Sequence, residues 1–170
     1  SDTRICVCPT TEANLGDGLF PLASFIDHGG VLGIGSDSHI SVSPVEELRW
    51  LEYGQRLQAR QRNVASRHAG ESVGESLFAR SLAGGAAASG TAVGTIAAGA
   101  RADLVVLDDA SPVLAARDTS DAMDSFIFSG NVPLVRDVMV GGRWVVRDGQ
   151  HVDQSRIAER YRHTVERIKA

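Results

Sequence analysis

The sequence predicts an α/β chain with one parallel β-α-β unit, a helical middle and a small β-rich part. Two short apolar runs, Arg4–Cys8 and Val31–Gly35, flank a stretch with helical spacing. Capping boxes at Ser43 and Ser72 each begin a long helical stretch. Gly141-Gly142 joins two runs rich in β-branched residues, as in a hairpin.

The first unit is expected to run strand, loop, helix, strand. Strand 4–8 ends at Pro9, and the polar stretch 10–18 predicts an irregular loop. A helix is predicted from Pro21 to about Gly29. Its apolar face carries Leu22, Phe25 and Ile26. Strand 31–35 then pairs in parallel with the first strand.

Two long helices are predicted in the middle of the chain. The Ser43 box begins a helix from Pro44 to about Arg62. Its expected buried positions are Val45, Leu48, Trp50 and Leu51. The Ser72 box begins a helix that runs to about Ser89 and contains Gly84-Gly85. Each of these glycines costs the helix about 1 kcal/mol, so a close packing partner is expected.

The second half of the chain changes to β-rich texture. Strands are predicted at Val93–Ile96 and Asp103–Leu107, followed by a hairpin of Val135–Val140 with Arg143–Val146. Asp153 is expected to cap a last helix. One stripe of that helix carries Ile157, Tyr161, Val165 and Ile168.

Composition excludes several classes of partner. A net charge of −4, with no basic stripe, argues against nucleic acid or an anionic membrane. The longest uncharged stretch, residues 81–100, is too weakly apolar to span a bilayer. No signal peptide is visible at Ser1. Cys6 and Cys8 predict two buried free thiols, which fits a reducing cytoplasm.

The predicted elements do not complete a sheet. Two parallel strands with helices on one side leave the other face of the sheet uncovered. We therefore expect the chain to be the carboxyl-terminal piece of a larger α/β protein, joined to a β-rich satellite domain. The expected divisions are residues 1–90, 91–150 and 151–170.

The polar run Gly35–His39 marks the candidate site. Chemistry in parallel α/β folds lies at the carboxyl ends of the strands, so Asp37 is the leading candidate for a catalytic or metal-binding residue. The run contains the letters of a catalytic triad, but consecutive side chains diverge and cannot converge on one substrate atom. Asp37 either caps a turn or helix, or it binds a metal or moves a proton. The five histidines show no ligand spacing, so other metal ligands would lie outside this chain.

The remaining polar candidates have weaker support. His39 points either into the site or away from it. Glu12 and Asn14 are expected to brace the loop after the first strand. His28 is expected at a helix carboxyl terminus, where positive charge is favourable. Ser38 receives no role.

Several of these motifs together resemble the amidohydrolase superfamily. Residues 8–18 (CPTTEANLGDG) and 35–39 (GSDSH) resemble the last two strands of its barrel. Residues 93–108 are similar to its return into a small β-sandwich, and residues 138–149 to its closing hairpin. Residues 44–57 and the 9–18 segment resemble the formimidoylglutamate deiminases within it. Thr11-Glu12 stands where many related deaminases and chlorohydrolases carry Ser-Asn, which favours that group.

The resemblance implies a fold and a reaction. The chain would be the carboxyl-terminal portion of a (β/α)8 barrel: its last two strands and following helices, part of the β-sandwich domain and a terminal helix. One divalent ion, usually zinc, would be held by Asp37 and by ligands that lie before Ser1. Asp37 would also move a proton while N-formimino-L-glutamate is hydrolysed to N-formyl-L-glutamate and ammonia, in histidine degradation. Expected partners are the small-molecule substrate, the remainder of the protein and a second copy in a homodimer.

Two alternatives remain open. Another zinc-dependent deaminase or chlorohydrolase of the superfamily carries the same strand-end motifs. A non-catalytic polypeptide, in which the motifs serve packing or assembly, is the alternative from a different class.

Overall fold

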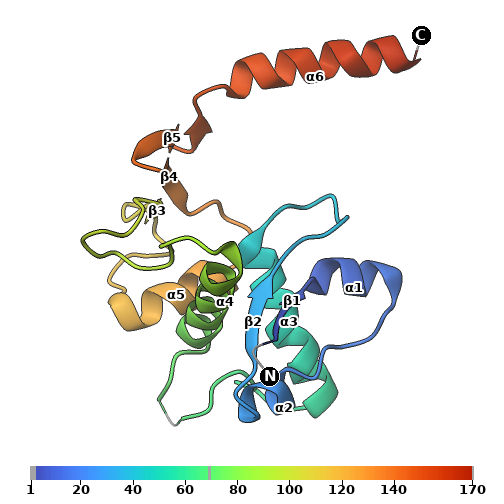
Figure 1. Ribbon diagram of the computed structural model, residues 1–170, viewed down its shortest axis with the longest axis vertical. Helices are drawn as coiled ribbons and strands as arrows, with labels where there is room; N and C mark the ends of the chain where they lie inside the picture. Colours follow the sequence, from blue (N-terminus) through green and yellow to red (C-terminus); the bar gives the residue numbers. More distant parts are fainter. Residues whose placement is uncertain (1–2, 69, 170) are drawn as a thin grey trace. The chain divides into compact units, whose positions relative to one another are not determined.

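The computed structural model describes residues 3–68 and 70–169 (Figure 1). The chain divides into two compact units, one of Ser1–Ala100 with Asp109–Val132 and one of Arg101–Asp108 with Pro133–Ala170. Among the described residues, no helix is long and apolar enough to cross a membrane. The domain divisions expected at residues 90 and 150 stay predictions.

The predicted β-α-β unit is confirmed in the first unit. Strand β1 (Arg4–Val7) pairs in parallel with β2 (Val31–Ile34), in a register that places Val7 opposite Ile34. Helix α2 (Leu22–Asp27) lies in the connection and buries Leu22 and Ile26. The strands therefore end side by side, which brings the segments after Val7 and Ile34 together.

The segment predicted as an irregular loop is instead helix α1 (Pro9–Leu15), so that prediction was wrong. Pro9 occupies the first turn, where its missing N–H is not needed. The Cys8 N–H donates to Glu12 Oε1 at 2.9 Å, and Gly16 ends the helix at φ 77°. The polar residues typical of a loop therefore supply the ends of a short helix.

Helices α3 (Pro44–Ala59) and α4 (Val73–Ser89) begin where the capping boxes predict. The Glu46 N–H donates to Ser43 Oγ, and the Glu75 N–H donates to Ser72 Oγ. The buried face of α3 carries Glu47, Leu48, Leu51, Glu52 and Gln55. Trp50 was expected on this face but is 46% exposed, because position 50 is about half a turn away from Leu48.

Helix α5 (Thr119–Phe128), which the sequence did not predict, completes the first unit. The Gly74 N–H at the start of α4 donates to Asp124 Oδ1 at 2.6 Å. Arg49 of α3 donates to the Ile127 carbonyl at 2.6 Å. These tertiary contacts add to a local cap, in which the Asp121 N–H donates to Asp118 Oδ1 at 3.1 Å. The core comprises Val7, Leu22, Ile26, Leu32, Leu48, Leu51, Ala65, Val73, Leu77 and Ile127.

The small-residue face of α4 packs directly on β2, as its glycines predict. A β-carbon at Gly84 would collide with the Leu32 carbonyl and lie 2.7 Å from Gly33 N. The same atom at Gly85 would meet nothing within 4 Å. The lost helix propensity of Gly84 is therefore offset by a close helix–strand approach.

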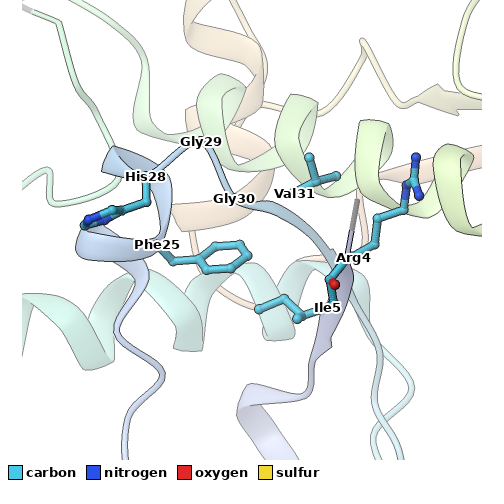
Figure 2. Close-up of a pocket in the computed structure, with 8 residues that line it drawn as sticks. Arg4, Ile5, Phe25, His28, Gly29, Gly30 and Val31 are labelled. Atoms are coloured by element: carbon cyan, nitrogen blue, oxygen red, sulfur yellow. The ribbon is translucent and has the colours of Figure 1, made fainter. Parts of the chain in front are cut away.

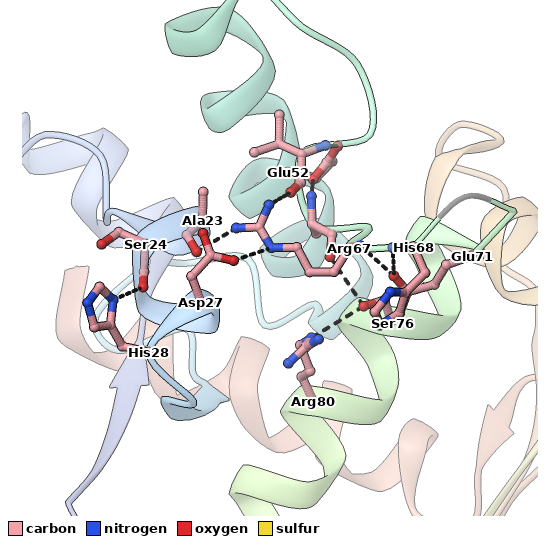
Figure 3. Close-up of polar contacts among 12 residues, drawn as sticks. Ala23, Ser24, Asp27, His28, Glu52, Arg67, His68, Glu71, Ser76 and Arg80 are labelled. Atoms are coloured by element: carbon pink, nitrogen blue, oxygen red, sulfur yellow. Dashed lines mark hydrogen bonds and ion pairs between the residues drawn. The ribbon is translucent and has the colours of Figure 1, made fainter.

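A polar network ties the segment after α3 to its neighbours (Figure 3). Arg67 donates to the Ala23 carbonyl at 2.5 Å and lies 3.1 Å from Asp27. Glu52, which is fully buried, accepts from the N–H groups of Val64 and Ala65 at 2.9 Å each. These contacts fix residues 60–68 against α2 and α3.

Unit two is an antiparallel sheet followed by a helix. Strands β3 (Leu104–Leu107), β4 (Val135–Val140), β5 (Arg143–Arg147) and β6 (Gln150–His151) pair in that order. The predicted hairpin is confirmed, with Gly141 and Gly142 at φ 55° and 79° as a type I′ turn requires. Helix α6 (Gln154–Lys169) has no buried residue among those described.

The strand predicted at residues 93–96 is not formed. Gly94 has φ 85°, a left-handed conformation that interrupts an extended strand. That part of the first unit is a series of bends and turns.

Candidate functional site

The candidate site lies where β1 and β2 end. The Gly35 N–H donates to the Val7 carbonyl at 3.0 Å, which continues the parallel pairing one residue beyond β2. A β-carbon at Gly35 would lie 3.1 Å from Cys6 Sγ and 3.5 Å from Cys8 Sγ. Glycine therefore leaves room for the two thiols beside the strand end.

Asp37 lies in the turn that follows β2. The His39 N–H donates to the Ser36 carbonyl at 2.9 Å, which closes the turn around Asp37 and Ser38. Asp37 has φ 46°, in the left-handed region that aspartate tolerates better than most residues. Its side chain is exposed and accepts no hydrogen bond from any described residue. The catalytic or metal-binding role expected of Asp37 stays a prediction.

The two cysteines are free thiols, as predicted, but neither is buried, so the prediction of a buried pair was wrong. Cys6 is exposed and Cys8 is half-buried. Burial, the neighbouring Cys6 thiol and the carboxylates of Asp37 and Glu12 raise the pKa of Cys8 to about 11. Cys8 is therefore a protonated thiol at neutral pH and a weak metal ligand in that state.

Three of the other polar candidates, Glu12, His28 and His39, make local hydrogen bonds. Glu12 caps α1 through the Cys8 N–H, as the bracing role required, while Asn14 is exposed. Ser41 N–H donates to His39 Nδ1 at 3.1 Å. His28 follows the last residue of α2, with Nδ1 2.7 Å from the Ser24 carbonyl, as predicted.

Two buried residues near the site were not predicted to matter. Glu47 of α3 is 1% exposed and accepts from both the N–H and the hydroxyl of Thr10. The Thr11 hydroxyl donates to the Ser36 carbonyl at 2.7 Å. The sequence places Glu47 on the same helix face as Leu48 and Leu51. It does not indicate that Thr10 is the residue that donates to Glu47.

The described residues do not form a complete metal site. Within the described part of the chain, no three His, Cys, Asp or Glu side chains are grouped so that they hold a cation. A catalytic zinc takes three protein ligands and keeps one open position. Asp37 could supply one anionic oxygen ligand to such an ion.

A pocket at the other end of the two strands is remote from this chemistry. It has a volume of about 400 Å³ and lies at the amino ends of the strands, beside Arg4, Ile5 and Val31. Figure 2 shows the Phe25 ring extending from α2 toward Ile5 across this pocket. Because Asp37 follows the opposite ends of the strands, we do not assign the pocket to the candidate site.

Comparisons with known proteins agree with the motif resemblance. The Amidohydrolase family model matches residues 1–145. The chain is 53% identical over 155 residues to formimidoylglutamate deiminase from Pseudomonas aeruginosa, covering 91% of this chain and 34% of that protein. It is 28% identical to a 5-methylthioadenosine/S-adenosylhomocysteine deaminase from Pyrococcus abyssi, covering 92% of this chain and 36% of that protein.

A solved structure shares the fold. An amidohydrolase from Brucella melitensis matches with a TM-score of 0.87 at 37% identity, covering 99% of this chain and 37% of that chain. The chain spans about a third of the length of the curated relatives that it matches.

Proposed function

The chain belongs to the amidohydrolase family, and we propose that it is part of a deiminase acting on N-formimino-L-glutamate. The reaction adds water to the formimino carbon and releases ammonia, leaving N-formyl-L-glutamate. We place this step in histidine degradation in the cytoplasm. A hydrolase or deiminase is the activity that family membership supports.

One observation carries the choice of substrate. Identity to formimidoylglutamate deiminase is 53%, against 28% to the nucleoside deaminase from Pyrococcus abyssi. The Thr11-Glu12 pair in α1 belongs to the same resemblance. Another deaminase or chlorohydrolase of the family is the second candidate, supported by the weaker likeness to the nucleoside deaminase.

In this proposal Asp37 is the catalytic residue of the chain. Its exposed carboxylate, at the end of β2, takes the proton from the attacking water and passes it to the departing nitrogen. A carboxylate suits this role because its oxygens can accept a proton from water and later return it to the leaving nitrogen.

A divalent ion, which we propose to be zinc, completes the site. When bound, it supplies a Lewis acid that lowers the pKa of water toward roughly 7. Asp37 is the ligand that this chain offers, and the remaining ligands would come from the longer protein. The motif match of residues 35–39 supports this assignment.

The architecture proposed with this function is the carboxyl-terminal part of a (β/α)8 barrel. β1 and β2 would be its last two strands, and the antiparallel sheet of the second unit would belong to the small β-sandwich domain. The rest of the protein is then an obligatory partner, and we propose a homodimer as the assembly.

A substrate panel tests the proposal. The intact protein that contains this chain is assayed for ammonia release from N-formimino-L-glutamate and S-adenosylhomocysteine, and for chloride release from a chloro-s-triazine. We expect turnover of the formimino compound to exceed that of the others by at least about 100-fold in kcat/KM, as hydrogen-bonded substrate selection allows. Preference for the nucleoside would favour the second candidate. No turnover of any of them by metal-loaded protein would favour the non-catalytic alternative.

A further inference from the structure

A buried carboxylate in α3 has no catalytic role in the proposed reaction, yet it is held in a defined position. Glu47 is 1% exposed, and its Oε2 accepts from the Thr10 N–H at 2.9 Å. Its Oε1 accepts from the Thr10 hydroxyl at 2.5 Å. Both carboxylate oxygens are thus used on one residue of α1. Burying a carboxylate costs free energy, and an apolar residue would fill the same position more cheaply.

Thr11, which follows Thr10, contacts the backbone just after β2. Thr11 is 7% exposed, and its hydroxyl donates to the Ser36 carbonyl at 2.7 Å, across 25 residues of sequence. Ser36 directly precedes Asp37. The first turn of α1 is therefore fixed to α3 on one side and to the turn that carries Asp37 on the other.

The Ser36 carbonyl accepts two hydrogen bonds that hold the turn after β2. It accepts the Thr11 hydroxyl and also the His39 N–H, at 2.7 and 2.9 Å. A carbonyl oxygen has two lone pairs, so both are used here. Asp37 lies in the turn that these two hydrogen bonds close. Its φ is 46°, an unfavourable conformation that persists where the surrounding contacts stabilise it.

We infer that Thr11, held by Glu47 through Thr10, is the positioning residue for the Asp37 carboxylate. The inference rests on the proposed role of Asp37. The hydrogen bonds from Thr10 to Glu47 and from Thr11 to Ser36 fix the orientation of the peptide before Asp37. A shift of about 1 Å in a reacting group lowers turnover up to about 100-fold. Substrate binding elsewhere in the site does not depend on that peptide, so kcat should fall while KM stays nearly constant.

The test uses the intact protein that contains this chain. Thr11→Val keeps the shape of the side chain and removes the hydroxyl, while Thr11→Ser keeps the hydroxyl. Thr164→Val is the matched control, since it removes a similar hydroxyl donor to a carbonyl (Arg160, 2.9 Å) in α6. Turnover, KM, zinc retention against a chelator and the thermal midpoint are measured for each variant, with Asp37→Asn in parallel.

We expect Thr11→Val to lower kcat by about 10- to 100-fold and to speed zinc loss. Thr11→Ser should restore both, and Thr164→Val should change neither. Normal kcat in Thr11→Val beside an inactive Asp37→Asn would overturn the positioning role and leave the proposed function standing. An active Asp37→Asn would overturn both.

Loss of fold in Thr11→Val is covered by Glu47→Leu. Leucine fills the buried position and removes both oxygens that accept from Thr10, while Thr11 stays in place. A lower kcat at unchanged KM in this variant supports the positioning role, and an unchanged kcat refutes it.

Discussion

Asp37 combines an exposed carboxylate with a strained backbone. Its φ of 46° is unfavourable for L-residues by roughly 1–2 kcal/mol, and this cost is smaller for aspartate than for most residues. Strained residues cluster where a function requires a fixed side chain. Asp148, after β5, has a similar φ of 51°, so the backbone conformation alone does not assign a role to Asp37.

The sequence singled out Asp37 as a candidate but did not predict the hydrogen bonds around the turn that carries it. A short apolar strand that ends in a polar run is a local pattern, readable without a structure. The hydrogen bond from Thr11 to Ser36 depends on the parallel pairing of β1 and β2, which no local pattern encodes. Glu47 was readable as a buried acid, yet its partner Thr10 was predicted to be in a loop.

Gly84 gives a stability prediction with a matched control in the adjacent residue. Gly84→Ala should destabilise the chain by about 1–3 kcal/mol or more, because its β-carbon collides with the backbone of Leu32. Gly85→Ala should stabilise it by up to about 1 kcal/mol through helix propensity, since that β-carbon meets nothing. Urea unfolding of the two variants measures the difference. Equal midpoints would contradict the close packing of α4 on β2.

At the scale of elements, the predictions that succeeded rest on local chemistry. The capping serines begin α3 and α4, and Gly141-Gly142 forms the hairpin turn. Helix α1 was missed because the polar residues that end it are also typical of loops. Helix α5 has a local cap at Asp118 and a tertiary contact from the Gly74 N–H to Asp124. The strand at residues 93–96 was wrong because Gly94 has a positive φ.

The hairpin of the second unit depends on the charge of Asp137. Its carboxylate accepts from the Asp148 N–H and from Arg136 Nε, each at 3.0 Å. The Asp148 amide, together with Arg136 and Arg147, holds the pKa of Asp137 below its usual value. A lowered pKa in the folded state stabilises the hairpin above the unfolded pKa, and this contribution disappears as pH falls through the folded value.

We therefore expect amide exchange in β4 and β5 to quicken, relative to intrinsic rates, as the pH falls below about 4. Asp137→Asn should show the faster exchange already at neutral pH. Asp148→Asn is the control, because it removes a nearby carboxylate and leaves the Asp148 N–H in place. Exchange that is the same in Asp137→Asn and Asp148→Asn would contradict the role of Asp137.

At the scale of the whole molecule, the chain is short for its family. The curated relatives are about three times as long, and the first unit has a sheet of two strands. Large apolar side chains beside the site are exposed, with Ile40 at 96% and Val42 at 81%. The sequence predicted the family, which the family match confirms. That further parts of a longer protein cover this sheet and these side chains stays a prediction.

The 170-residue chain alone is expected to be inactive. One carboxylate does not hold a catalytic zinc, and a site needs about three protein ligands. Equilibrium dialysis should find less than one tightly bound zinc per chain, and ammonia release should stay at background. Full activity of this chain by itself would refute the proposal that its ligands lie elsewhere.

The central claim is that Asp37 is the catalytic carboxylate contributed by this chain. Its most direct test is the kcat of the intact protein with Asp37→Asn, assayed on N-formimino-L-glutamate beside Asp17→Asn, which removes an exposed carboxylate after α1. Removing a proton-transfer group should lower kcat by about 10²- to 10⁴-fold, with an unchanged circular dichroism spectrum and an active Asp17→Asn. Near-normal turnover by Asp37→Asn would contradict the account.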